Sequence, residues 1–192
     1  FMIKNYFVLV STLLLSACAA TPPAPLALMP TAVFTPQPWA HNKTLNLSCI
    51  DKAPNSYIAV IDNGSTENVQ VIQPQQPISL TLHHVLAQQL AGQGFRINNH
   101  ATSTMAVTIE KALVTIKQGL VKYNMHSELQ LQLSVKTPNG QFIKRYSGNS
   151  SREDALTASN KDIATSMNKL INSILKESAN DSELNKYLTE NI

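Results

Sequence analysis

The sequence predicts an α+β fold of two layers, in which a mostly antiparallel sheet is packed by two main helices and a short C-terminal helix. Three observations lead to this prediction. Apolar and polar residues alternate from Leu129 to Val135, which is the period of a strand with one buried face. Apolar residues recur at helical spacing from Ile163 to Leu175. Pro138-Asn139-Gly140 separates two strand patterns, and so short a turn joins antiparallel neighbours.

Strands are expected where alternating segments lie between turn signals. Leu45, Leu47 and Cys49 alternate with polar residues, and Asp62-Asn63-Gly64 is a turn signal that closes a second run, from Tyr57 to Ile61. A hairpin is expected over 121–147, on either side of the Pro138 turn. The predicted strands are 45–49, 57–61, 69–72, 105–116, 129–135 and 142–147.

Helices are expected from end caps and apolar periodicity. Ser79 can cap the first helix, which ends in the Gly92–Gly94 segment. Ser159 and Asp162 have the spacing of a capping box at the start of the second helix. A further capped start at Ser182 leads into the short terminal helix.

The first segment, 1–17, has the pattern of a secretory signal peptide. Lys4 supplies a positive charge, and an apolar run follows from Tyr6 to Leu15. Leu15-Ser16-Ala17-Cys18 resembles the lipobox at which lipoprotein signal peptidase cuts, before a cysteine that carries a diacylglyceryl thioether. A transmembrane helix would need roughly 20 apolar residues, and Pro22-Pro23 interrupts this run too early.

Cys18 is therefore the expected lipidation site, and the membrane is the first expected partner. Two or more acyl chains hold a protein stably at a bilayer. In lipoproteins that this pattern resembles, Asp after the cysteine signals retention in the inner membrane, whereas Ala19 stands at that place here. We expect a lipid anchor in the outer membrane, with the domain facing the periplasm.

The chain divides into the signal peptide (1–17), the lipidated cysteine with a Pro-rich tether (18–43) and a single α+β periplasmic domain (44–192). The prolines favour an extended tether, which could reach roughly 75 Å. Phe34 and Trp39 lie in this tether and either pack back on the domain or dock on a partner. With Cys18 consumed by lipid, Cys49 has no partner in its own chain, and we expect a buried small hydrophobe rather than a reactive thiol.

Several exact strings resemble the YajG family of uncharacterised bacterial lipoproteins. They are Gln118-Gly119 with Val121-Lys122-Tyr123-Asn124, Gly94-Phe95 at the end of the first helix, and Ala158-Ser159-Asn160-Lys161-Asp162-Ile163-Ala164. The resemblance runs from the lipobox nearly to the C-terminus. It implies a lipoprotein for which the family offers no established catalytic activity or cofactor. The longer Pro-rich stretch at 36–41 departs from the family pattern.

Charge and motif content exclude several classes of function. The formal charge of +3 is spread thinly along the chain, so nucleic acid is not an expected partner. His83 and His84 are adjacent and point about 100° apart on a helix, and the other histidines lack nearby ligands, so no metal is expected. No nucleophile elbow or phosphate-binding glycine loop occurs, so we expect no cofactor and no enzyme. An unrecognised hydrolase is the remaining catalytic alternative.

The candidate interaction surface lies on the predicted hairpin, which could bring several cations to one sheet edge. Such a patch could meet anionic lipid, glycan or an acidic protein surface, and the alternative is an ordinary solvated strand face. Part of the patch matches the family strings. The candidate residues are Lys117, Gln118, Lys122, Tyr123, Asn124, Lys144 and Arg145, with Arg152 nearby.

These observations favour a non-catalytic binding or assembly module that docks on another envelope protein, as an accessory subunit of a larger envelope complex. The alternative is a periplasmic carrier that holds a lipid or glycan fragment between the sheet and the helices. A carrier would need an apolar pocket of several hundred Å³.

Overall fold

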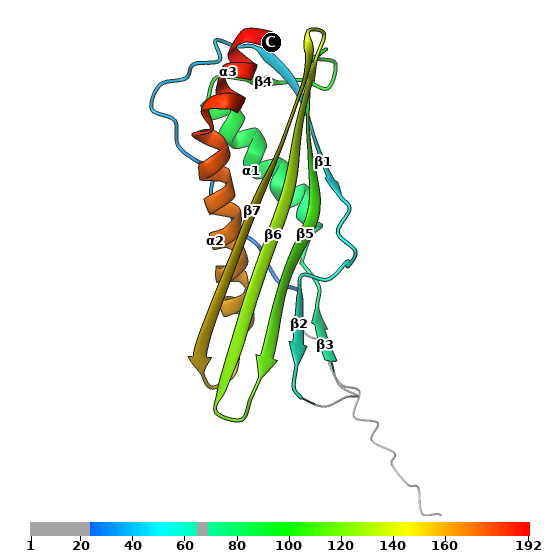
Figure 1. Ribbon diagram of the computed structural model, residues 1–192, viewed down its shortest axis with the longest axis vertical. Helices are drawn as coiled ribbons and strands as arrows, with labels where there is room; N and C mark the ends of the chain where they lie inside the picture. Colours follow the sequence, from blue (N-terminus) through cyan, green and yellow to red (C-terminus); the bar gives the residue numbers. More distant parts are fainter. Residues whose placement is uncertain (1–23, 65–68) are drawn as a thin grey trace, which may run out of the picture.

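Three long antiparallel strands run along the molecule in the computed structural model, which describes residues 24–64 and 69–192 (Figure 1). They are β5 (Thr104–Gln118), β6 (Lys122–Thr137) and β7 (Gly140–Ala155). β6 pairs with both neighbours in antiparallel register, so the predicted hairpin is confirmed and is longer than the sequence pattern suggested. The predicted signal peptide and Cys18 lie outside the described residues.

Shorter strands pair with the other edge of β5 and make the sheet mixed. β1 (Thr44–Asp51) and β2 (Ala59–Asp62) both run parallel to β5, one after the other along its length. β3 (Val69–Ile72) is antiparallel to β2, and β4 (Arg96–Ile97) is parallel to β1. The fold is thus α+β, as expected, and the sheet is mixed: its three long strands are antiparallel to one another, whereas β1 and β2 pair in parallel with β5. Alternation along a strand records which face is buried and carries no information about the direction of its neighbour.

Three helices lie beside the sheet: α1 (Ile78–Gly92), α2 (Asn160–Ala179) and α3 (Ser182–Asn191). The capping box predicted for α2 is confirmed, because the Ser159 and Asp162 side chains bond each other's backbone amides. The other two predicted caps are wrong. α1 follows Pro77 without a side-chain cap, and α3 is capped by Asp181 rather than by Ser182. Asp181 reaches two free amides of the first turn and therefore defines the start of α3.

The core lies between the sheet and helices α1 and α2, and apolar side chains of α2 and of the strands that it covers are fully buried. Ile163, Met167 and Ile171 of α2 and Leu129 of β6 have no solvent-exposed surface. Gly148 of β7 faces α2, and a Cβ atom there would lie 3.3 Å from a methyl group of Leu170. The helix therefore packs tightly on the strand, and these contacts leave the carrier hypothesis without support in this part of the core.

Residues 24–43 do not form the free tether that the proline content predicts. They lie against the domain, where Leu26 is buried. The Met29 amide donates to Asn168 Oδ1 at 3.0 Å, and the Thr31 amide donates to Asn172 Oδ1 at 2.8 Å. Prolines keep the backbone extended, but the residues between them still supply apolar side chains and amides that α2 can bind.

The two aromatic residues of this segment have different positions. Trp39 packs back on the domain, with its ring edge-on to Phe95 at 5.3 Å between centroids. Phe34 remains exposed to solvent. From the sequence, each aromatic residue could either pack back on the domain or dock on a partner. The contact with Phe95 settles this question for Trp39 alone.

Cys49 of β1 is half-buried and packs against the core. Burial raises the pKa of its thiol to about 12. A thiol that stays protonated at neutral pH is a poor nucleophile, so Cys49 has the packing role that the alternation around it predicts.

Candidate functional site

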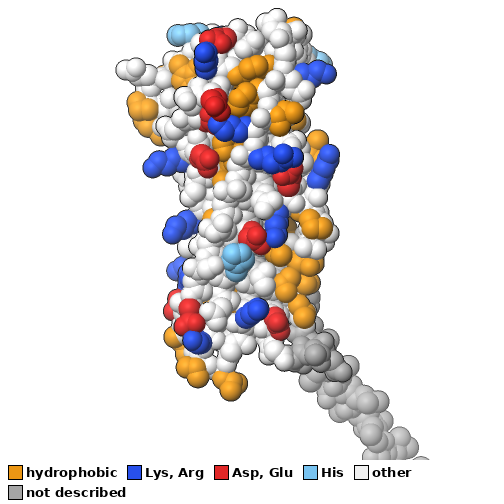
Figure 2. All heavy atoms as spheres, in the orientation of Figure 1, with side chains coloured by type: hydrophobic (Ala, Val, Ile, Leu, Met, Phe, Trp, Pro, Cys, Tyr) orange, Lys and Arg blue, Asp and Glu red, His pale blue; other side chains and the backbone are white. Residues whose placement is uncertain are grey.

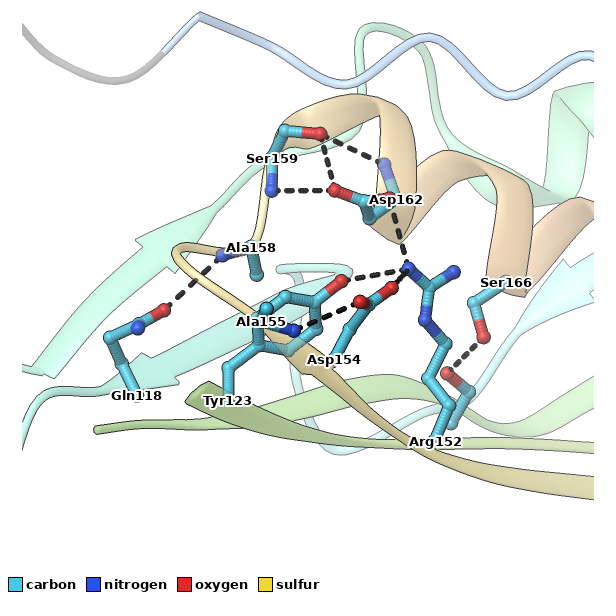
Figure 3. Close-up of polar contacts among 10 residues, drawn as sticks. Gln118, Tyr123, Arg152, Asp154, Ala155, Ala158, Ser159, Asp162 and Ser166 are labelled. Carbon is cyan, nitrogen blue, oxygen red and sulfur yellow. Dashed lines mark hydrogen bonds and ion pairs between the residues drawn. The ribbon is translucent and has the colours of Figure 1, made fainter. Parts of the chain in front are cut away.

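The fold brings two of the distinctive sequence strings together at the end of the sheet where β5 turns into β6 (Figure 3). Gln118 holds the turn against the connection between β7 and α2. Its amide nitrogen donates to the Leu156 carbonyl oxygen at 2.9 Å, and its amide oxygen accepts from the Ala158 backbone at 3.2 Å. The Leu156 amide in turn donates to the Val121 carbonyl oxygen at 2.8 Å. One side chain thus cross-links two segments that are distant in sequence.

Arg152 is the centre of a polar cluster behind this turn (Figure 3). Its Nη2 atom lies 2.8 Å from the Tyr123 hydroxyl, 2.8 Å from Asp154 and 3.1 Å from Asp162. Tyr123 is buried, so its hydroxyl depends on this partner. Ser127 and Ser166 share a buried hydrogen bond of 2.7 Å beside the cluster and tie β6 to α2.

Asp162 links this cluster to the start of α2. Its carboxylate accepts from the Ser159 hydroxyl and from the Ser159 amide, and it also contacts Arg152. The hydrogen bonds from Ser159, together with the Arg152 charge, hold the pKa of the Asp162 carboxyl below its ordinary value. The carboxylate form is therefore favoured in the folded protein.

Asp162→Asn is expected to remove the part of the folding free energy that depends on the ionised Asp162 carboxylate. A carboxyl pKa that is lower in the folded than in the unfolded chain stabilises the protein at pH values above the unfolded pKa, which is near 4 for aspartate. This stabilisation is lost as the pH falls through the folded-state pKa. Urea unfolding at several pH values should show the substituted chain about 1 kcal/mol less stable from pH 5 to 7. The gap should narrow below about pH 4. A gap that stays constant down to pH 2 would contradict this assignment.

The predicted positive patch does not form, because its members separate along the length of the strands. Lys144 lies on β7 opposite Leu133 and pairs with Asp181 at 2.7 Å, far from the β5–β6 turn. Arg145 pairs with Glu110 at 3.3 Å.

The remaining candidates stay near the turn. Lys117 and Asn124 are exposed and opposite one another, and Lys122 pairs with Glu153 at 2.9 Å. Tyr123 is buried and supports the turn from within, so it is not part of the surface.

The end of the molecule carries an apolar surface that sequence reasoning missed. Leu120 and Val121 of the β5–β6 turn are 105% and 76% exposed, and Leu156 beside them is 76% exposed. We call these three residues the apolar tip. Figure 2 shows hydrophobic side chains at the lower end of the molecule, where Figure 1 places this turn. Two apolar residues after Gly119, at a position that must turn, are the signal that could have revealed it.

β7 has an unpaired outer edge among the described strands, since its only partner there is β6. The Thr137–Gly140 pair closes a two-residue turn, and hydrogen-bonded and non-bonded pairs then alternate without a register shift. The backbone amides and carbonyls of alternate β7 residues therefore point away from β6. These residues are Gln141, Ile143, Arg145, Ser147, Asn149, Ser151 and Glu153.

The surface also has shallow hollows. One of about 390 Å³ lies on the open sheet face near Lys117 and His126, and another of about 310 Å³ lies near Asp51 and Gln76.

Within residues 24–64 and 69–192, no three His, Cys, Asp or Glu side chains are grouped to hold a metal ion. No helix in this described part is long and apolar enough to span a bilayer.

A family model described as "Uncharacterized lipoprotein" (Lipoprotein_16) matches residues 30–189. The chain belongs to this lipoprotein family. Two relatives are the uncharacterized lipoproteins YajG of Escherichia coli strain K12 and of Escherichia coli O6:H1. Each is 22% identical over 190 residues, which cover 98% of this chain and 97% of the relative. The resemblance to the YajG family is thus confirmed.

A solved structure shares the fold of this lipoprotein. It is a crystal structure of a Xanthomonas campestris protein, with a TM-score of 0.57 and 10% sequence identity. The match covers 82% of this chain and 93% of that one. At this identity the likeness concerns the fold alone.

Proposed function

We propose that this lipoprotein is a non-catalytic binding module, anchored in the outer membrane by lipid on Cys18, that pairs the free edge of β7 with a strand of another envelope protein. The lipoprotein family supports the anchor, and Ala19 after the cysteine supports the outer membrane. The unpaired edge of β7 is the observation that carries the binding role. In such a complex this protein would be an accessory subunit.

A strand of 16 residues is an unusually long free edge. Natural proteins protect edges with short strands, prolines, bulges or charges, because unpaired amides and carbonyls bind other strands. β7 contains no proline, and its pairing with β6 shows no bulge. The segment from Tyr146 to Ser151 is also uncharged, between Arg145 and Arg152. An extended partner segment could add to this stretch through main-chain hydrogen bonds.

The edge can be tested with one residue, because the Asn149 amide points away from β6. Asn149→Pro removes an outward donor without breaking a β6–β7 bond, and proline is tolerated at an edge strand. A photo-crosslinking amino acid at Ser147 should form a discrete adduct with another envelope protein in cells. Asn149→Pro is expected to lower the adduct yield about tenfold.

Asn149→Thr is the matched control, because it changes the same exposed side chain and keeps the backbone donor. It should leave the adduct unchanged, and circular dichroism should show all variants folded. Equal adducts from the proline and threonine variants would contradict strand pairing. An adduct of twice the mass of this chain would instead identify a second copy as the partner and would overturn the assignment to another protein.

A further inference from the structure

The apolar tip is held rigidly, although its side chains face solvent. The Leu156 backbone has a φ angle of 70°, a left-handed conformation that leucine rarely adopts. It is maintained by the bonds of Leu156 to Val121 and to Gln118. Gly119 makes the turn tight, since a Cβ atom there would lie 2.9 Å from the Lys122 carbonyl oxygen. The fold thus fixes three large apolar side chains in water, where each has a higher free energy than it would have in an apolar environment.

The described chain begins close to this end of the molecule. The Asn160 side chain, at the start of α2, donates a hydrogen bond of 3.0 Å to the Ala24 carbonyl oxygen. Leu156 precedes Asn160 by only four residues. The C-terminus lies at the opposite end, as Figure 1 shows. Ala24, from which the chain leads back toward Cys18, therefore lies at the same end of the molecule as the apolar tip.

Chain length limits where the bilayer can lie relative to the domain. Cys18 and Ala24 are six residues apart, which corresponds to at most about 22 Å of extended chain. Strands of the length of β6 extend over roughly 50 Å. An acylated Cys18 would therefore hold the bilayer near the tip, and the far end of the sheet would be out of its reach.

The charges around the tip nearly cancel. Carboxylates offset the cations, and three pairs are in contact: Lys122 with Glu153, and Arg152 with both Asp154 and Asp162. Attraction to anionic head groups is therefore weak, and contact with lipid would depend on burial of apolar area. The cations are Lys117, Lys122, Arg152 and Lys161, and the carboxylates are Glu153, Asp154, Asp162 and Asp62, the last of which lies opposite Lys117.

We propose that the apolar tip inserts into the surface of the lipid bilayer to which the protein is anchored, and so holds the domain upright with the β7 edge free. This inference depends on the lipid anchor of the proposed function and is independent of strand pairing. Leu120, Val121 and Leu156 enter the boundary between head groups and acyl chains. The bound lipid is zwitterionic as readily as anionic.

The depth of the tip can be measured by fluorescence of the full lipidated chain in phosphatidylcholine vesicles with brominated acyl chains. Leu120→Trp places a fluorophore at the tip, and its emission, after subtraction of the Trp39 signal of the unsubstituted chain, should fall on the order of twofold. Ile143→Trp is the matched control, because Ile143 is exposed on β7 near the opposite turn. Its emission should not change. Adding Val121→Ser and Leu156→Ser to Leu120→Trp should at least halve the quenching.

Flotation of the vesicles separates failure of the tip from failure of the anchor. If the protein floats with the vesicles but the tip and control positions are quenched equally, the anchor stands and tip insertion is overturned. If the protein does not float, both the anchor and the inserted tip are overturned. Quenching that requires phosphatidylglycerol, or that disappears in 0.5 M salt, would overturn insertion driven by apolar burial.

Discussion

Asp181→Ala is expected to lower the free energy of unfolding by about 3 kcal/mol, since it removes a helix cap and leaves a buried hydroxyl without a partner. The Asp181 side chain is only 6% exposed and accepts from the amides of Glu183 and Leu184 at the start of α3. It also accepts from the Tyr146 hydroxyl at 2.7 Å and pairs with Lys144. Urea unfolding monitored by circular dichroism measures the loss. At this chain length, it corresponds to a decrease in Tm of roughly 6–12 °C.

Asp181→Asn is the control, because asparagine also caps helices and keeps an acceptor for Tyr146. It should cost about 1 kcal/mol at most. Tyr146→Phe in the Asp181→Ala chain removes the unpaired hydroxyl, so the double variant should be more stable than the sum of the two single effects predicts. Strictly additive effects would show that the Tyr146 hydroxyl does not depend on Asp181.

Arg152→Ala is expected to cost about 2 kcal/mol, mainly because the buried Tyr123 hydroxyl loses its hydrogen-bond partner. The guanidinium is partly exposed, so its pairs with Asp154 and Asp162 add little in water. The contribution of Arg152 is therefore the support of Tyr123 beneath the β5–β6 turn. Unfolding in urea is again the measurement.

Tyr123→Phe tests this assignment directly. On its own it should cost about 1 kcal/mol, and in the Arg152→Ala chain it should restore part of the stability that was lost. Arg152→Lys should behave more like alanine than like arginine, because a single ammonium does not reproduce the planar guanidinium. If the lysine variant is as stable as the original chain, then charge rather than geometry maintains the cluster.

The contacts of Asp181 and the polar cluster around Arg152 are here called the two clusters, and each positions a surface on which a proposed function depends. Asp181 holds α3 against β7 through Tyr146 and Lys144, and so supports the strand whose free edge would bind a partner. Arg152 and Gln118 hold the turns that present the apolar tip. Loss of either cluster should therefore disturb one surface more than the other. Adduct formation at Ser147 and lipid quenching at Leu120 report on the two surfaces separately.

The sequence alone was sufficient for features that depend on residues close in the chain. The alternation around Leu131 predicts a strand with one buried face, and the Ser159–Asp162 spacing predicts the cap of α2. Both follow from local geometry, because the strand period and the reach of a capping side chain extend over only a few residues. The family strings were visible for the same reason, although their structural purpose was not.

Tertiary structure decided everything that depends on which distant segments meet. Parallel pairing of β1 and β2 with β5 requires the chain to cross over, and no local pattern records such a crossover. The same applies to Lys144, because the long strands place it far from Lys122, where it pairs with Asp181. Leu120 and Leu156 become one apolar surface because the Gln118 side chain and the hydrogen bond from the Leu156 amide to the Val121 carbonyl oxygen join their turns. Sequence thus determines which faces are buried, and the fold determines which exposed residues act together, since the latter depends on contacts between residues far apart in the chain.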